Sequence, residues 1–389
     1  MISLDMPKNA ILFHKRLHGK IFVDSKIRKP SNKTLQIIYT PGVATVCKEI
    51  FNHPNMKYQL TSKGNNVAII TDGTRILGLG NIGPNAAMPV MEGKSVLYRE
   101  YGNISAFPLC LNTTDRKQIV ETVKAISPAF GAINLEDIES PKVLDISHDL
   151  EKSLDIPVFH DDRHGTSVVV LAALLNSLVL VNKKISEIKV VIAGAGSAGY
   201  GIWKLLCFAG CTNIIVLDSK GAIYKGRKEG MNKYKNEIAQ FTNRDEHGCL
   251  GEAIVRSDVF IGVSGIKNLL KTRMIKKMNP DPIVFALTNP YPEIHPTLAR
   301  NAGARIIATG SFNYENKVNN ALVFPYVMRA ILDLKIRKIT PDILYAVAVA
   351  IANTIPKRKL ADNKIIPEIG DKSLQKRITA AILRQSRLN

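Results

Sequence analysis

The glycine-rich stretch between Lys189 and Asp218 constrains the fold of this chain more than any other segment. A run of β-branched residues leads into the pattern G-x-G-x-x-G, an apolar segment through Leu206 follows, and a second apolar run ends in Asp218. This order predicts a strand, a tight turn, a helix and a second parallel strand, the unit that opens a doubly wound, Rossmann-type dinucleotide-binding domain. Glycines let a pyrophosphate approach the helix N-terminus, and the carboxylate can accept hydrogen bonds from a ribose. The predicted dinucleotide-binding residues are Gly194, Ala195, Gly196, Ser197, Ala198, Gly199 and Asp218.

Two acidic pairs lie upstream, each directly after an apolar run. Glu136–Asp137 follows residues 132–135, and Asp161–Asp162 follows residues 156–159. The residues after the second pair predict a buried helix with Thr166 as its N-cap. Either pair alone is typical of a cap or a turn. Together, carboxylates at strand ends favour a hard cation such as Mg²⁺ or Mn²⁺.

The length of 389 residues favours two domains over one. We predict an N-terminal α/β substrate and metal domain over residues 1–163. Residues 164–389 then form the Rossmann-type domain, in which two helices after Thr340 cover the sheet. The fold class is therefore α/β.

The net charge of +20 requires nucleic-acid binding to be considered. The basic residues are scattered and not interleaved with aromatics, so a solvated surface that attracts small anions is favoured, with no nucleic-acid partner. Five cysteines without paired spacing predict reduced thiols. No secretory signal is visible, and the apolar run after Ser167 is interrupted by Asn176, which predicts a segment too short to span a bilayer. We expect a cytoplasmic protein with no membrane partner.

Several polar residues elsewhere are candidates for a substrate site. A second G-x-G-x-x-G, at residues 78–83, lacks the strand and acid that a nucleotide site needs, and predicts a close-approach loop. Arg75 and Lys94 flank this loop and can face an anionic substrate, although both can equally be solvated surface residues. Asn289 and Asn320 follow predicted strands, where a carboxamide binds a carboxylate or a nicotinamide, or else serves turn chemistry alone.

A dinucleotide site combined with a hard-metal site narrows the chemistry. A hydride acceptor implies oxidation of an alcohol, and a metal chelated by a 2-hydroxy acid can promote decarboxylation after oxidation. Such a reaction needs a general base and a general acid. Lys94, with a pKa expected to be lowered by burial and positive neighbours, and Tyr39, before a Thr-Pro-Gly turn, are residues of the right type. Tyr39 alone would more often pack its ring in a core.

These residues lie in motifs that resemble malic enzyme. The resemblance is carried in chain order by residues 39–42, 71–73 with 77–84, 91–94, 134–137, 160–166 and 318–320. It covers about residues 10 to 330 and is closest to the short, single-unit prokaryotic form. Arg163 departs from the pattern, since the family commonly has Gln beside the metal-binding aspartate.

The resemblance implies a role for each matching residue. Lys94 stands at the position of the general base, Tyr39 at that of the proton donor to enolpyruvate, and Asp161 at that of the residue that orients the lysine. The implied metal ligands are Glu136, Asp137 and Asp162, and the implied contacts to malate or nicotinamide are Arg75, Lys94, Asn289 and Asn320. The implied reaction is metal-dependent oxidative decarboxylation of L-malate to pyruvate and CO₂, in a homodimer or larger homo-oligomer.

The sequence is compatible with either dinucleotide and with more than one reaction. Asp218 favours NAD⁺, while the basic residues downstream, Lys220, Lys225, Arg227 and Lys228, keep NADP⁺ possible. The alternative activities on the same fold are an oxaloacetate decarboxylase and a malolactic-type lyase.

Overall fold

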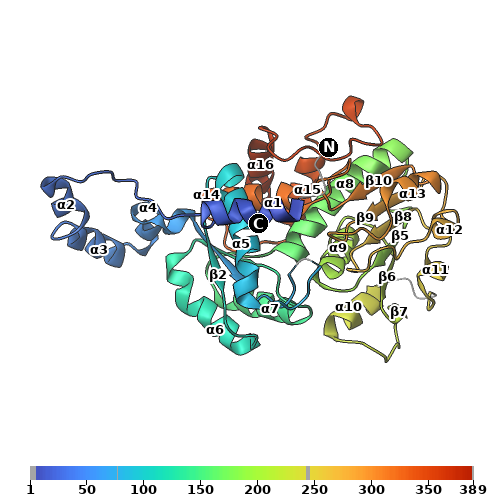
Figure 1. Cartoon of the computed structure of the whole chain (residues 1–389), viewed down its shortest axis with the longest axis horizontal. Coiled ribbons are helices and arrows are strands. Elements are labelled where there is room, and N and C mark those ends of the chain that lie inside the picture. The colour runs from blue at the N-terminus through green and yellow to red at the C-terminus, as the bar shows by residue number, and fades with distance from the viewer. Residues whose placement is uncertain (1–5, 77, 242–245, 388–389) are drawn as a thin grey trace.

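The computed structural model describes residues 6–76, 78–241 and 246–387 and contains two sheets in one body (Figure 1). The first sheet has the strand order β2 (Ser105–Cys110), β1 (Asn66–Thr71), β3 (Ala132–Leu135) and β4 (Val158–His160), all parallel. The second has the order β10 (Ile306–Thr309), β9 (Ile283–Ala286), β8 (Val259–Gly262), β5 (Lys189–Ala193), β6 (Asn213–Asp218) and β7 (Gly221–Ala222). Only β7 runs antiparallel, against β6. Most of these strands are short apolar runs buried on both faces, as parallel strands covered by helices are.

Helices cover both faces of these sheets, except for the first four helices of the chain, which lie outside them. In the first half of the chain they are α1 (Met6–Leu17), α2 (Asn32–Ile38), α3 (Val43–Asn52), α4 (Lys57–Leu60), α5 (Gly83–Gly102), α6 (Arg116–Ile126), α7 (Lys142–Ser153) and α8 (Thr166–Val181). In the second half they are α9 (Ser197–Phe208), α10 (Lys233–Phe241), α11 (Leu250–Ala253), α12 (Thr272–Ile275), α13 (Pro296–Asn301), α14 (Phe324–Leu334), α15 (Pro341–Ala352) and α16 (Leu374–Ser386). Short helical turns are η1 (Pro54–Met56), η2 (Ser62–Asn65), η3 (Ser127–Ala129), η4 (Asp161–Gly165), η5 (Asn320–Leu322) and η6 (Lys357–Lys359).

Each sheet has a point where the strand order reverses, and this places the site. In the first sheet the chain leaves β1 for β2 on one side and later returns to β3 on the other. In the second it leaves β5 for β6 and returns to β8. Ligands of open α/β sheets bind outside the carboxyl ends of strands at such reversals. The register pairs Leu135 with both Ile70 and His160, so the polar residues after β1, β3 and β4 meet at one edge.

Helix α8 lies at the centre of the molecule. Residues 168 to 174 are fully or almost fully buried, and they belong to one apolar core that reaches from β1 to α16. Helices α9 and α15 pack against α8. Because a single core joins the two sheets, the cleft between them is held by packing as well as by the connecting chain.

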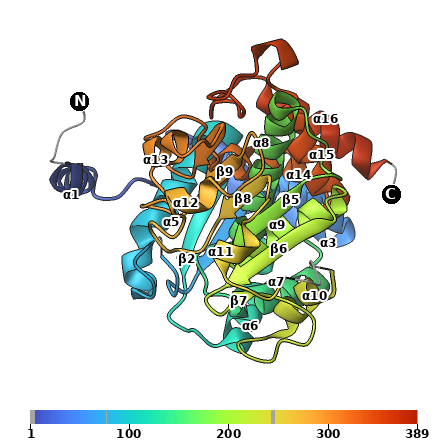
Figure 2. The same ribbon diagram turned by 90° about the vertical axis from the view of Figure 1, so that its right-hand side faces the viewer.

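The described N-terminal helices lie outside this body. In Figure 1, α2, α3 and α4 project to one side of the first sheet, and in Figure 2, α1 stands away from the body on the opposite side from α16. No residue from 21 to 62 is buried. The sequence indicated only a weakly patterned region before residue 38, and helices α1 and α2 were not predicted there.

The structure confirms the α/β class and the strand–helix–strand unit formed by β5, α9 and β6. Two predictions of local structure were wrong. The pattern of residues 66–77 favours a strand, a turn and a second strand, but after the turn the described residues form only an isolated bridge, Ile76 with Gly80. Thr166 is not an N-cap, because the π turn η4 already continues into α8 from Asp161.

The expectation that the apolar segment after Ser167 is too short to span a bilayer was wrong, because the helical segment runs from Asp161 to Val181. By length and composition it is the one helix, among the described residues, that is long and apolar enough to cross a membrane. Its most apolar window is 78% buried inside the fold, as the core helix of a folded domain would be.

The domain division at 163/164 stays a prediction. That point lies inside η4, and the chain returns later to the first sheet, where α14 packs on α5. The rings of Tyr98 on α5 and Phe324 on α14 are 4.8 Å apart between centroids.

Candidate active site

A cleft of about 260 Å³ lies where the carboxyl ends of the two sheets face each other. The first sheet and its loops contribute acidic side chains, and the second contributes the glycine turn and three asparagines, Asn289, Asn319 and Asn320. Of the residues predicted from the sequence, those that line this cleft are Arg75, Glu136, Asp137, Asp162, Gly196, Ser197, Ala198, Asn289 and Asn320. The fold therefore brings together predicted metal, substrate and dinucleotide residues that lie up to 245 positions apart (75 to 320).

Lys94 lies beside the cleft, held between two carboxylates. Its Nζ is 2.7 Å from Glu136 Oε2 and 2.8 Å from Asp161 Oδ2, and its side chain is only 6% exposed. The amide of Asn320 donates to the same Asp161 oxygen. Helix α5 thus presents the amine to residues that follow β3 and β4, because Lys94 lies on its buried face.

A second set of buried residues fixes this arrangement. Tyr98, one turn after Lys94 on α5, donates to Asn134 Oδ1 at 2.6 Å. Asn134 in turn donates to Glu136 Oε2 at 2.9 Å. The Lys94 Nζ also lies 4.0 Å from the ring centroid of Phe324, a cation–π distance. Sequence reasoning assigned no role to Tyr98, Asn134 or Phe324; only the helical spacing of Tyr98 from Lys94 offered a signal.

The expectation that Lys94 has a lowered pKa was wrong for this arrangement of side chains. Burial lowers the pKa of Lys94, but the charges of Asp161 and Glu136 outweigh burial, so that the pKa is raised above its ordinary value. The neighbours that matter are carboxylates and not the positive charges we expected. Both carboxylates therefore favour the ammonium form of Lys94.

The predicted metal ligands share the cleft without forming a ready-made cluster. Among the described residues, no group of three or more His, Cys, Asp or Glu side chains is arranged to hold a metal ion. Glu136 is turned toward Lys94 instead. Burial and the nearby charge of Asp162 raise the pKa of Asp137 to about 7, so a cation bound beside these carboxylates would favour their charged forms.

The donor chemistry of this part of the cleft fits a hard cation. Glu136, Asp137 and Asp162 offer only oxygen atoms, which Mg²⁺ and Mn²⁺ prefer. Asp161 Oδ1 is buried and has no hydrogen-bond partner. A buried carboxylate oxygen without a partner is costly, and a cation or its bound water nearby would relieve that cost.

The glycine turn has the geometry that a dinucleotide site requires. Gly194 has φ +122°, and a Cβ there would lie 2.6 Å from the carbonyl oxygen of Val263. A Cβ on Gly199 would lie 1.8 Å from the carbonyl oxygen of Gly194. No side chain caps the N-terminus of α9, and Gly196 opens toward the cleft, with Arg75 Nη1 3.4 Å from where its Cβ would be. The free amides of α9 can thus bind a pyrophosphate.

Gly199→Ala should destabilise the fold by about 3 kcal/mol, at the upper end for overpacking, and should weaken dinucleotide binding. The added methyl cannot fit against the Gly194 carbonyl without moving α9 off the sheet. Chemical denaturation and a dinucleotide titration measure the two effects. Gly251→Ala is the matched control, since a Cβ there meets its nearest atom only at 3.7 Å. Equal stability of the two variants would contradict the close packing.

Asp218 follows β6 as predicted, but it is already paired. Its Oδ2 lies 2.6 Å from Arg227 Nη2 and 2.6 Å from Lys235 Nζ, and its Oδ1 accepts from the backbone N–H of Lys220. Burial would raise the pKa of Asp218, but these hydrogen bonds hold it below the usual value. Lys235 was missed from the sequence, since it lies 17 residues away on α10 with no local pattern linking it to β6.

Arg163 does not add free positive charge to the cleft. Its Nη1 lies 3.2 Å from Glu151 Oε1 on α7, and Arg163 lines a separate pocket behind η4. The carbonyl of Arg163 also contacts α9 closely, since a Cβ on Gly201 would lie 2.2 Å from it. At this position the side chain therefore pairs with α7, while the backbone packs on α9.

Tyr39 is the one predicted catalytic residue that the structure does not bring to the cleft. It ends α2, on the projecting N-terminal region, and is 72% exposed. No predicted site residue accompanies it there.

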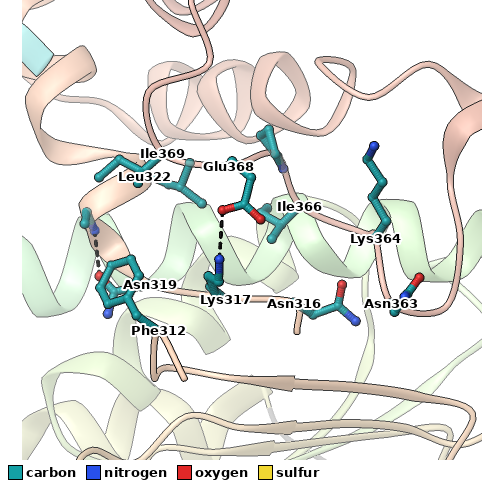
Figure 3. A pocket seen from close by; sticks show the side chains of 12 residues that line it. Phe312, Asn316, Lys317, Asn319, Leu322, Asn363, Lys364, Ile366, Glu368 and Ile369 are labelled. Carbon is teal, nitrogen blue, oxygen red and sulfur yellow. Dashed lines mark hydrogen bonds and ion pairs between the residues drawn. The ribbon is translucent and has the colours of Figure 1, made fainter. Parts of the chain in front are cut away.

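A second cavity, of about 290 Å³, lies next to the cleft (Figure 3). It is formed by the segment after β10 and the segment between α15 and α16, and the ion pair of Lys317 with Glu368, 3.0 Å long, spans it. Asn319 lines both this cavity and the cleft. Residues 310–317 thus shape a neighbouring cavity as well as the rim of the cleft.

Known proteins with the same order of two domains are similar to nearly the whole of this chain. Residues 18–121 match the family model described as malic enzyme, N-terminal domain, and residues 164–386 match that described as malic enzyme, NAD binding domain. The bifunctional malic/malolactic enzyme of Bacillus subtilis is 47% identical over 380 residues, which are 97% of this chain and 92% of that protein. The NAD-dependent malic enzyme of Geobacillus stearothermophilus is 48% identical over 372 residues, 95% of this chain and 77% of that protein.

Solved structures of malic enzymes also have the same fold as this chain. The crystal structure of the NAD-dependent malic enzyme from Thermotoga maritima superposes with a TM-score of 0.92 at 44% identity, covering 96% of this chain and 98% of that one. This confirms the predicted order of an N-terminal malic enzyme domain and a Rossmann-like NAD-binding domain. The chain belongs to the malic enzyme family of NAD(P)-dependent oxidoreductases.

Proposed function

We propose that this protein oxidatively decarboxylates L-malate to pyruvate and CO₂ with reduction of NAD(P)⁺. The observation that carries the proposal is the buried Lys94, held by Glu136 and Asp161 at 2.7 and 2.8 Å at the edge of a cleft that also contains the glycine turn. A titratable amine, hard oxygen ligands and a dinucleotide site within one cleft are the parts that oxidation and decarboxylation of a 2-hydroxy acid require.

Glu136, Asp137 and Asp162 are the residues that would hold a divalent cation. Bound there, Mg²⁺ or Mn²⁺ would polarise the C2 oxygen of malate, and the dinucleotide would accept the hydride. Arg75 contributes positive charge to the same cleft and binds a malate carboxylate, with Asn289 and Asn320 as neutral donors. These side chains orient the substrate between the metal ligands and the glycine turn.

Lys94 removes the C2 hydroxyl proton. The amine can do so only in its neutral form, and its pKa is raised here by Asp161 and Glu136. Binding of Glu136 to a cation would remove one of the two carboxylate charges that raise this pKa, which would favour loss of the proton from the amine. Asp161 remains to orient the amine. Asn320 holds Asp161 in place through the hydrogen bond to its Oδ2.

Tyr39 supplies a proton to C3 of the enol that decarboxylation leaves. A phenol is a suitable general acid for a carbon centre once it is within hydrogen-bonding reach. The hydroxyl of Tyr98 does not serve instead, because it is fully buried and donates to Asn134.

The first test is reduction of the dinucleotide by L-malate in the presence of Mn²⁺. We expect a steady rise in nicotinamide absorbance that requires malate and Mn²⁺ and stops on addition of a chelator. No reduction with either NAD⁺ or NADP⁺ would refute the proposed reaction.

We propose NAD⁺ as the preferred cofactor, with weak discrimination against NADP⁺. The carboxylate of Asp218 favours ribose hydroxyls, but Arg227 and Lys235 on the same oxygen make the local charge positive, so a 2′-phosphate is not strongly repelled.

Asp218→Ala should shift the ratio of kcat/KM toward NADP⁺ by about tenfold or more, equal to about 1.4 kcal/mol. Lys235→Ala should shift the ratio the opposite way, because it removes a cation available to a 2′-phosphate. Steady-state kinetics with both cofactors measure the ratios. A wild type that prefers NADP⁺ tenfold, with little change in Asp218→Ala, would show that the basic residues govern the choice.

A malolactic activity is the second candidate. The name of the Bacillus subtilis relative includes it, and that protein is similar over 97% of this chain. In that reaction the reduced dinucleotide would return its hydride to the product, giving lactate without net reduction. We also propose a cytoplasmic location, consistent with five free cysteines.

A further inference from the structure

We propose that Glu293 is a positioning residue for the nicotinamide half of the dinucleotide. Its side chain is fully buried behind the cleft and joins the two loops that follow β8 and β9. It acts through those loops and not by direct contact with the ligand. This inference deepens the proposed function and rests on it, because it takes the cleft as the dinucleotide site.

Glu293 is an acid at a position where an apolar side chain would be expected. Its side chain is 0% exposed, and the next residue, Ile294, is part of the apolar core of the second sheet. Burial raises the pKa of Glu293, and hydrogen bonds from Thr288 and Ser264 oppose that rise without cancelling it. A buried carboxyl group is tolerated only where donors surround it, so its partners indicate what it holds in place.

The hydrogen bonds to the Glu293 carboxyl group come from two loops. In the loop after β8, the backbone N–H and the hydroxyl of Ser264 both donate to Oε1 at 3.2 Å. In the loop after β9, the N–H of Thr288 donates to Oε2 at 3.2 Å, and its hydroxyl donates to Oε1. The same hydroxyl accepts from the N–H of Gly265 at 3.0 Å. One carboxyl group thus ties both loops together.

The carboxyl group takes over where the pairing of the two strands ends. Beyond β8 and β9, the N–H of Leu287 still donates to the carbonyl of Gly262 at 2.9 Å. The carboxyl group of Glu293 lies directly against that glycine. A Cβ on Gly262 would lie 2.4 Å from Glu293 Cδ and 2.6 and 2.7 Å from its two oxygens. Residue 262 must therefore lack a side chain for the carboxyl group to occupy this place.

Both loops that Glu293 joins form the wall of the cleft. Val263 and Gly265 line it from the loop after β8, and Thr288 and Asn289 line it from the loop after β9. Loops at a sheet edge are mobile unless contacts hold them, and small displacements of ligand-binding groups are costly. The carboxyl group therefore fixes the position of groups that face the ligand, including the carboxamide of Asn289.

The position of these loops assigns them to one half of the dinucleotide. The glycine turn follows β5 and Asp218 ends β6, so the pyrophosphate and the adenosine ribose are expected on that side of the sheet. Strands β8 and β9 lie on the other side of β5, as Figure 2 shows. A dinucleotide binds across the point where the strand order reverses, so its nicotinamide half extends over the loops that Glu293 holds.

The test compares NADH with ADP-ribose, which lacks only the nicotinamide ring. In Glu293→Gln the amide NH₂ cannot accept a hydrogen bond, so at least one donor in the two loops loses its acceptor. Fluorescence titration should show NADH binding weakened by about tenfold or more, while calorimetry should show ADP-ribose binding changed by less than about twofold. Equal weakening of both ligands, or unchanged NADH affinity, would overturn the positioning role.

Asp258→Asn is the matched control for a loss of stability. Asp258 is also a buried acid, but it lies just before β8, at the end of the strand away from the cleft. It pairs with Lys183 Nζ at 2.7 Å and accepts from the N–H of Lys189 at 2.8 Å. This variant should unfold at a lower denaturant concentration and still bind both ligands as wild type does. A selective loss of NADH affinity in Asp258→Asn would show that reduced stability alone explains the effect, and would overturn the proposal.

Thr288→Val decides the question if Glu293→Gln does not fold. It keeps the carboxyl group and removes only the hydroxyl that joins Gly265 to it. NADH should bind about threefold more weakly or worse, with ADP-ribose unaffected. Unchanged NADH affinity in Thr288→Val would contradict the proposal. Neither titration contains malate, so a failure of wild type to oxidise malate would refute the proposed reaction without altering these affinity ratios.

Discussion

Asp162→Asn should lower kcat/KM for L-malate by about 10³-fold, which corresponds to the several kcal/mol that a Lewis acid contributes. Asp162 lies after β4 and, with burial, raises the pKa of Asp137 to about 7. Removal of its charge leaves too few hard oxygen ligands to hold a divalent cation beside a 2-hydroxy acid. Dinucleotide binding should persist, because Asp162 is not part of the glycine turn or of the Asp218 cluster.

Two readouts separate loss of metal from loss of fold. Calorimetric titration with Mn²⁺ should show binding to wild type and little or none to Asp162→Asn, and fluorescence titration with NADH should show similar affinity for both. Asp155→Asn makes the same change at an exposed residue seven positions away and should behave as wild type. Full turnover by Asp162→Asn, or by wild type in excess chelator, would refute a metal role for this residue.

Lys94→Ala should abolish malate oxidation, and Tyr39→Phe should slow only protonation of the enol, each by about 10²- to 10⁴-fold. The two steps can be followed apart. Oxidation appears as nicotinamide absorbance, and protonation appears as solvent deuterium exchange at C3 of pyruvate. Small primary amines should partly restore oxidation in Lys94→Ala, while oxaloacetate decarboxylation should persist in Tyr39→Phe.

The lysine variant needs a control for stability. Without Lys94, two carboxylates at 2.7 and 2.8 Å lose their cation, which costs about 3–5 kcal/mol for a buried pair. Lys94→Arg keeps the charge but cannot give up a proton near neutral pH, so it should fold and remain inactive. Near-wild-type rates in both steps for the Lys94 and Tyr39 variants would refute the assignment of base and acid.

Local sequence patterns predicted the parts of the fold that depend on neighbours in the chain. The run from Val190 to Asp218 specifies strand, turn and helix through periodicity and glycine placement, and the structure has β5, α9 and β6 there. The amphipathic run after Asp115 likewise favours a helix, and the structure has α6 there, with the Asp115 side chain accepting from the N–H of Gln118 at its N-terminus. Glu136 and Asp162 were predicted to meet because carboxyl ends of parallel strands share an edge.

Properties that depend on contacts between residues far apart in the sequence could not be predicted from local patterns. The sequence gives no sign that Lys94 faces two carboxylates, because Glu136 and Asp161 lie 42 and 67 positions away (94 to 136 and to 161). The expected direction of its pKa was wrong for that reason. Lys235 reaches Asp218 from α10, and Tyr39 ends the projecting helix α2 with its side chain exposed.

The most direct test of oxidative decarboxylation is to measure all products of one wild-type reaction with L-malate, Mn²⁺ and NAD⁺. We predict one pyruvate, one CO₂ and one reduced dinucleotide for each malate consumed, with no lactate. Malate consumption that yields lactate and CO₂ without net reduction of the dinucleotide would contradict the proposed reaction and identify a malolactic lyase.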